Sequence, residues 1–92
     1  MNDSEQVVTA WLQQMTGRYH WISFRYEYSE RERVHYIAVY TDHGKEITCP
    51  DYCHDENLFH SRLAALYPDE TVLFGHADFS FKCSARSRLF SR

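Results

Sequence analysis

Cysteine and histidine side chains that could bind a metal ion lie close together in the segment Cys49-Pro50-Asp51-Tyr52-Cys53-His54, with His60 downstream. Zinc takes thiolate and imidazole ligands in a tetrahedral arrangement. Zinc modules usually separate their two ligand pairs by a dozen or more residues, whereas Cys53 and His54 are adjacent. On a helix, adjacent side chains diverge by about 100°. Cys49, Cys53, His54 and His60 are therefore weak candidates for metal ligands, and we predict that the protein binds no cofactor.

A nucleophilic cysteine is the second chemistry that this segment suggests. A helix N-terminus near Cys53 would favour its thiolate, and a histidine could serve as the base. The neighbouring carboxylates Asp51, Asp55 and Glu56 oppose this, because negative charge raises the pKa of a thiol. The sequence also lacks a glycine-rich phosphate loop, a GxSxG elbow and a His-Glu-x-x-His element. We therefore predict a protein that is not an enzyme.

Acidic and basic residues are unevenly distributed along the chain, whose formal net charge is −3. Between Cys49 and Phe81 the sequence has six acidic residues and one basic residue, Arg62. Residues 82–92 contain four basic residues and no acidic one. A general DNA-binding protein carries a basic stripe instead. Residues 85–92 form a basic tail that is either frayed or able to contact a partner through its arginines. These are Arg86, Arg88 and Arg92.

Length and composition indicate one globular domain, residues 1–92. The chain has 15 aromatic residues among 92, which excludes a disordered protein. The first residues lack the charged and apolar regions of a signal peptide, and no apolar run is long enough to span a membrane. An odd number of cysteines, three, fits a reducing compartment. We therefore predict a cytoplasmic protein with no membrane contact.

The elements that must position these side chains follow from hydrophobic periodicity. Val8, Trp11, Leu12 and Met15 share one face and predict a helix over residues 4–16. Alternation predicts strands over 19–29 and 33–41, and a short strand over 45–49 ends at Pro50. A second helix runs from about residue 52 or 55 to 66, and two more strands cover 71–74 and 79–84.

This order, α-β-β-β-α-β-β, predicts an α+β fold. Two helices pack on one face of a four- to five-stranded, mainly antiparallel sheet. We expect the helices to cover one alternating set of side chains from the first two strands: Ile22, Phe24, Tyr26, Tyr28, Val34, Tyr36, Ala38 and Tyr40. The other face of the sheet then carries Tyr19, Trp21, Arg25, His35 and Ile37, and is too apolar for a fully solvated surface.

That open face and the tail lead to the predicted function. Tryptophan and arginine are common energetic anchors of interfaces. We predict a non-enzymatic binding module that docks on a larger protein or nucleoprotein complex through Tyr19, Trp21, Arg25, His35, Ile37 and the tail arginines. Accessory or inhibitory proteins, including phage and mobile-element inhibitors of host machinery, are often small and motif-poor. The alternatives are a homodimer, a small zinc-binding domain, or a nucleic-acid-binding domain that uses the aromatic sheet face.

Overall fold

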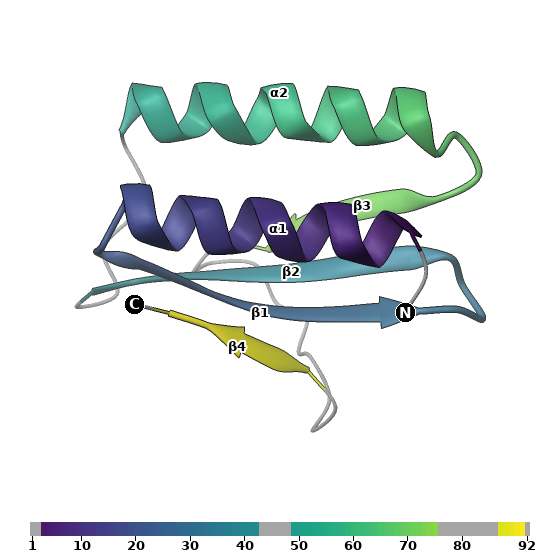
Figure 1. The fold of residues 1–92 in the computed structure, drawn as a ribbon, viewed down its shortest axis with the longest axis horizontal. Helices are drawn as coiled ribbons and strands as arrows, with labels where there is room; N and C mark the ends of the chain where they lie inside the picture. The colour runs from purple at the N-terminus through teal and green to yellow at the C-terminus, as the bar shows by residue number, and fades with distance from the viewer. Residues whose placement is uncertain (1–2, 43–48, 76–86, 92) are drawn as a thin grey trace.

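Two helices cover one face of a four-stranded mixed sheet (Figure 1). The structure is a computed structural model that describes residues 3–42, 49–75 and 87–91. The expected α+β class and the packing of both helices on one face are confirmed. The elements are α1 (Asp3–Arg18), β1 (Ile22–Ser29), β2 (Val34–Thr41), α2 (Pro50–Leu66), β3 (Thr71–Gly75) and β4 (Arg88–Phe90).

Helix α1 forms where the apolar residues recur at helical spacing. Val8, Leu12 and Met15 are buried against the sheet, and Trp11 packs at the edge of the same core. The helix begins with acidic residues and ends with Arg18, charges that suit the two ends of a helix dipole. The prediction of a helix over 4–16 is confirmed, with small extensions at both ends.

Strands β1 and β2 form an antiparallel hairpin, as expected. Residues 30–33 join them, and Ser29 pairs with Val34 across the turn. Arg33 has a φ of 57°, the left-handed conformation that lets a short loop match the twist of the strands. This turn fixes the register that places Tyr26 opposite Ile37 and Tyr28 opposite His35.

The hairpin register corrects the expected faces of β2. Residues directly opposite each other in an antiparallel pair point to the same side of the sheet. His35, Ile37 and Val39 therefore lie under the helices with the apolar side chains of β1, and their exposed fractions are 0%, 0% and 2%. The prediction that His35 and Ile37 lie on the open face is wrong. Val34, Tyr36, Ala38 and Tyr40 belong to the side away from the helices.

The sheet is mixed because β2, α2 and β3 form a β-α-β unit. The helix carries the chain back along the sheet, so that β3 pairs with β2 in parallel, from Thr71 opposite Val34 to Gly75 opposite Ala38. The strand order is β3-β2-β1-β4, and the expectation of a mainly antiparallel sheet is wrong. Pro50 stands at the start of α2, where the lack of an amide hydrogen costs nothing, and Cys49 is the N-cap.

The C-terminal residues supply the fourth strand. Phe90, Leu89 and Arg88 pair antiparallel with Phe24, Arg25 and Tyr26 of β1. Part of the expected tail is therefore ordered into the sheet. The expected strand over 79–84, and residues 45–48 of the expected third strand, lie outside the described residues.

Candidate functional site

The metal candidates lie around the first half of α2. The amide of Cys53 donates to the carbonyl of Cys49 at 3.1 Å, and both thiols are free and half-buried. His54 and His60 are exposed. Within the described ranges, no three His, Cys, Asp or Glu side chains gather in a way that could hold a metal ion. The structure therefore does not bring the four candidates together.

Tyr19 and Trp21, which were expected on the open face, pack at the end of the core before β1. The Tyr19 side chain is 8% exposed and donates its hydroxyl hydrogen to Asp55 Oδ2 at 2.9 Å. Its burial, and then its hydrogen bond to Asp55, raise the pKa of Tyr19 to about 12. Trp21 is half-buried and meets the Tyr19 ring edge to face at 6.2 Å. Both side chains therefore help to close one end of the core.

Of the four arginines that the sequence predicts as partner contacts, the structure describes two. Arg25 is exposed on the side of β1 away from the helices, and its Nη1 donates to Ser87 Oγ at 3.3 Å. Arg88 is exposed in β4, with its guanidinium 5.3 Å from the centre of the Phe90 ring. Arg86 and Arg92 lie outside the described residues. Among the predicted contact residues that the structure describes, Arg25 and Arg88 are the exposed ones.

A buried hydrogen-bond network joins four parts of the fold. Tyr26 Oη lies 2.6 Å from His35 Nδ1, and His35 Nε2 lies 2.6 Å from Glu70 Oε1. The Ser4 hydroxyl donates to the same Glu70 oxygen at 2.6 Å. The network thus links β1, β2, the loop before β3 and the first turn of α1. Tyr28 covers the imidazole as a stacked ring at 4.4 Å.

Burial and hydrogen bonding together set the protonation states in this network. Burial lowers the pKa of His35, although the hydrogen bond to Glu70 acts in the opposite direction. The neutral ring then accepts from the Tyr26 hydroxyl at Nδ1 and donates from Nε2 to Glu70. Burial opposes ionisation of Glu70, but the hydrogen bonds from Ser4 and His35 together lower the pKa of its carboxyl group. Burial raises the pKa of Tyr26, which keeps its hydroxyl protonated.

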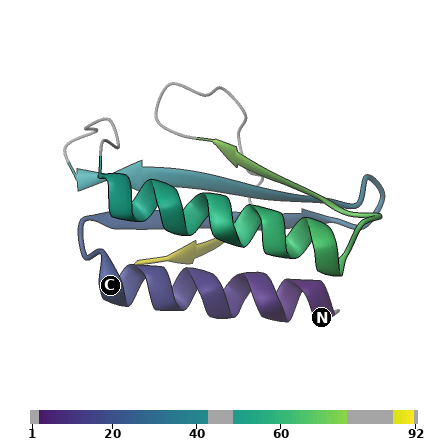
Figure 2. The ribbon, with the colours of Figure 1, turned by 90° about the horizontal axis from the view of Figure 1, so that it is seen from above.

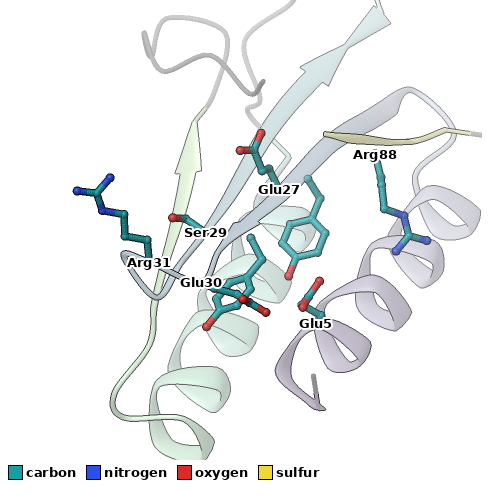
Figure 3. Close-up of a pocket in the computed structure, with 8 residues that line it drawn as sticks. Glu5, Glu27, Ser29, Glu30, Arg31 and Arg88 are labelled. Carbon is teal, nitrogen blue, oxygen red and sulfur yellow. The ribbon is translucent and has the colours of Figure 1, made fainter. Parts of the chain in front are cut away.

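A pocket of about 440 Å³ opens beside the Tyr26 end of this network. Its walls combine carboxylates with guanidinium groups, and Figure 3 shows Glu5 of α1 directed toward it while Arg31 extends away. Tyr26 resembles the outer member of a catalytic triad by position alone. The hydrogen bonds of these side chains tie β1, β2, α1 and the loop before β3 together.

A groove runs between the two helices on the side away from the sheet. Figure 2 shows α1 and α2 side by side and running in opposite directions. The groove has a volume of about 360 Å³. The Trp11 and Phe59 rings stack across it, with centres 4.3 Å apart and planes 5° from parallel. Leu58, which is 56% exposed, lines its rim, and Leu66, two turns further along α2, is 59% exposed.

No protein-family model matches this chain, and no curated protein or solved structure was found to be similar. Across the described residues, neither helix is long and apolar enough to cross a membrane. The function must therefore be argued from the surfaces themselves.

Sequence reasoning missed the network and the groove for different reasons. His35 stands in an apolar strand, and a polar residue there is a signal for a buried partner, but nothing in the sequence names Glu70 as that partner. The groove depends on how the two helices pack against each other, which the periodicity of each helix does not show. Trp11 belongs to the apolar face that the sequence predicts for α1, and it also lines the groove.

Proposed function

We propose that this protein is a non-enzymatic binding module that docks on a larger protein through its helix layer. The observation that carries the proposal is the helix groove, with Leu58 exposed beside the stacked Trp11 and Phe59 rings. Exposed apolar side chains next to a tryptophan, with arginines around them, are typical of protein interfaces. In this proposal the helix groove replaces the open sheet face as the main contact surface.

The proposal extends to the role and the compartment. A small binding domain suits an accessory or inhibitory protein acting on a larger protein or nucleoprotein complex, of the kind that phages and mobile elements use against host machinery. The free thiols of Cys49 and Cys53 are in keeping with a reducing cytoplasm.

The open sheet face is the second candidate surface. Arg25 stands there among exposed apolar side chains from three strands: Tyr40, Leu73 and Leu89. Leu89 is 57% exposed, nearly the same as Leu58. The two leucines therefore offer a matched comparison between the two faces of the molecule.

Partner capture by leucine variants tests the proposal. The bait proteins are the wild type, Leu58→Gln with Leu66→Gln, and Leu89→Gln, with captured proteins measured by quantitative mass spectrometry. We expect the helix variant to lose a defined partner by about tenfold or more, and Leu89→Gln to retain it. Loss with Leu89→Gln alone would assign the contact to the sheet face. A partner that both variants retain, or none with the wild type, would contradict the proposal.

A further inference from the structure

We propose that the groove between α1 and α2 binds an amphipathic helix that carries acidic residues beside its apolar stripe. This inference rests on the proposed function and names the chemistry of the partner. The relevant groups are Leu58, Trp11 and the two arginines that line the groove, Arg18 and Arg62.

The apolar part of the groove is rigid and already assembled. Phe59 is 5% exposed and Met15 is 2% exposed, so both are fixed in the core, and Trp11 is held against Phe59 by stacking. A preformed apolar surface binds without first having to order its side chains. Two antiparallel helices with a groove between them fit the stripe of a third helix, whose anchors recur every three or four residues.

Charge selects an acidic partner. Arg18, Arg62 and Asp55 are the charged residues of the groove, which leaves one positive charge in excess on a protein of net charge −3. Asp55 is already engaged, because its Oδ2 accepts from Tyr19 at 2.9 Å and lies 3.1 Å from Arg18 Nη1. Arg18 remains 57% exposed in that pair. Arg62 has no hydrogen bond or ion pair to the described part of the chain.

The spacing of Arg18 and Arg62 along the groove determines the spacing of the acidic residues on the bound helix. Arg18 lies level with Asp55, its ion-pair partner, and Arg62 follows Asp55 by seven residues on the same helix. Seven residues of helix rise about 10 Å, which is two turns. A bound helix would therefore meet both arginines with acids at positions i and i+7 and place apolar side chains at i+3 and i+4 against Leu58 and Trp11.

The same charges disfavour a second copy of this chain in the groove. The exposed stripe of α2 has Arg62 between Leu58 and Leu66. Its docking in the groove of another copy would bring Arg62 close to two further arginines, while the acid of the groove, Asp55, is already engaged by Tyr19 and Arg18. A nucleic acid would supply phosphates for the arginines, but its backbone would not fill the apolar centre.

A designed peptide pair provides the test. The probe is a fluorescein-labelled helical peptide with Glu at i and i+7 and Leu at i+3 and i+4, and its partner replaces both Glu with Lys. Fluorescence anisotropy measures binding to the wild type, Arg62→Glu and Leu58→Gln. The control Arg31→Glu makes the same charge change at an exposed turn residue on another part of the surface. Circular dichroism and the melting temperature confirm that every variant is folded.

We expect the acidic peptide to bind the wild type and Arg31→Glu about tenfold more tightly than either groove variant. The lysine peptide should bind Arg62→Glu better than it binds the wild type, because the charges are exchanged. Equal binding of the two peptides to the wild type, or no binding of the acidic peptide, would overturn the inference. Self-association that Leu58→Gln abolishes, or tighter binding of a short RNA or DNA than of the acidic peptide, would also overturn it. If partner capture still depends on Leu58 in those cases, the proposed function survives the loss of the inference.

Discussion

His35 Nε2 lies 2.6 Å from Glu70 Oε1, although the two residues come from different parts of the fold and the imidazole is fully buried. The other ring nitrogen of His35, Nδ1, lies 2.6 Å from the hydroxyl oxygen of Tyr26. A buried polar group with a full set of partners costs little, whereas the loss of one partner exposes the remaining group to the full penalty of desolvation. The network therefore makes sharp predictions for stability.

The two most informative variants are Tyr26→Phe and Tyr52→Phe, which remove one hydroxyl each from a buried ring. Tyr26→Phe leaves His35 Nδ1 without a donor and should lower the free energy of unfolding by about 1–2 kcal/mol. The Tyr52 hydroxyl is buried near the Glu56 carboxylate, and it makes no hydrogen bond of good geometry to the described residues. Tyr52→Phe should leave stability unchanged or raise it by up to about 1 kcal/mol. Urea unfolding measures both, and equal losses would contradict this reading of the network.

Stability should fall when the pH drops below the ordinary pKa of histidine. Burial lowers the pKa of His35 in the folded protein, while the unfolded chain takes up its proton near pH 6.5. The unfolded state therefore binds more protons, and stability that is complete above pH 6.5 is lost as the pH falls toward the folded pKa. The lowered pKa of Glu70 acts with the same sign below its ordinary pKa of 4.5.

Urea unfolding between pH 7.5 and 5 measures this slope. The groups that act on the ring are Glu5 from α1, Glu70 from the loop before β3, and Tyr26 and Tyr28 from β1. His35→Gln should flatten the slope, and His60→Gln, at an exposed position, should preserve it. NMR titration of the wild-type His35 ring gives the same information without a variant. A ring that protonates above pH 6.5 would disprove the assignment.

Trp21→Ala should lower stability by about 1–2 kcal/mol, because the indole packs on Tyr19 and the core. For a domain of this size the corresponding drop in melting temperature is about 5–15 °C. Arg25→Ala, at an exposed position, should change stability by less than about 0.5 kcal/mol. A melting temperature that Trp21→Ala leaves unchanged would return Trp21 to the surface role that the sequence suggested.

The Tyr19 phenol should resist ionisation until about pH 12. Its folded pKa is raised above the unfolded value of about 10, so the corresponding stability is complete below pH 10 and is lost as the pH rises to 12. Asp55→Asn keeps an acceptor but removes the negative charge, and should lower the pKa of Tyr19 without returning it to 10, since burial is the larger cause. NMR of ring-labelled tyrosine follows the titration. Asp51→Asn, an exposed change on the same helix, should have no effect.

The sequence predicted the elements whose two faces differ. Helix α1 and strand β1 each present one apolar face, and their positions are confirmed. Strand β2 has apolar residues on both faces, with Ile37 and Val39 on one and Val34 and Tyr36 on the other. Periodicity alone cannot tell which of these faces packs under the helices. The hairpin register determines this, and it places His35 within reach of Glu70.

The parallel pairing of β3 was missed for a related reason. A third strand over residues 45–49 favours an antiparallel meander, and of these residues the structure describes only Cys49. Cys49 caps α2, and α2 is the crossover between the parallel strands β2 and β3. The groove depends on the relative placement of the two helices, and Arg18 and Arg62 show no relationship in the sequence that would place them along one groove.

Strand β4 has a consequence for how the sheet assembles. It pairs with β1 near the other end of the chain, and β3 pairs with β2 across the intervening helix α2. The hairpin of β1 and β2 can form locally, but the two outer strands require closure of long loops. We therefore expect folding that is slower than for a helical protein of equal length and faster than for an all-β domain. Until β4 docks, the outer edge of β1 presents unpaired amides and carbonyls, and during this interval the chain is most prone to aggregate.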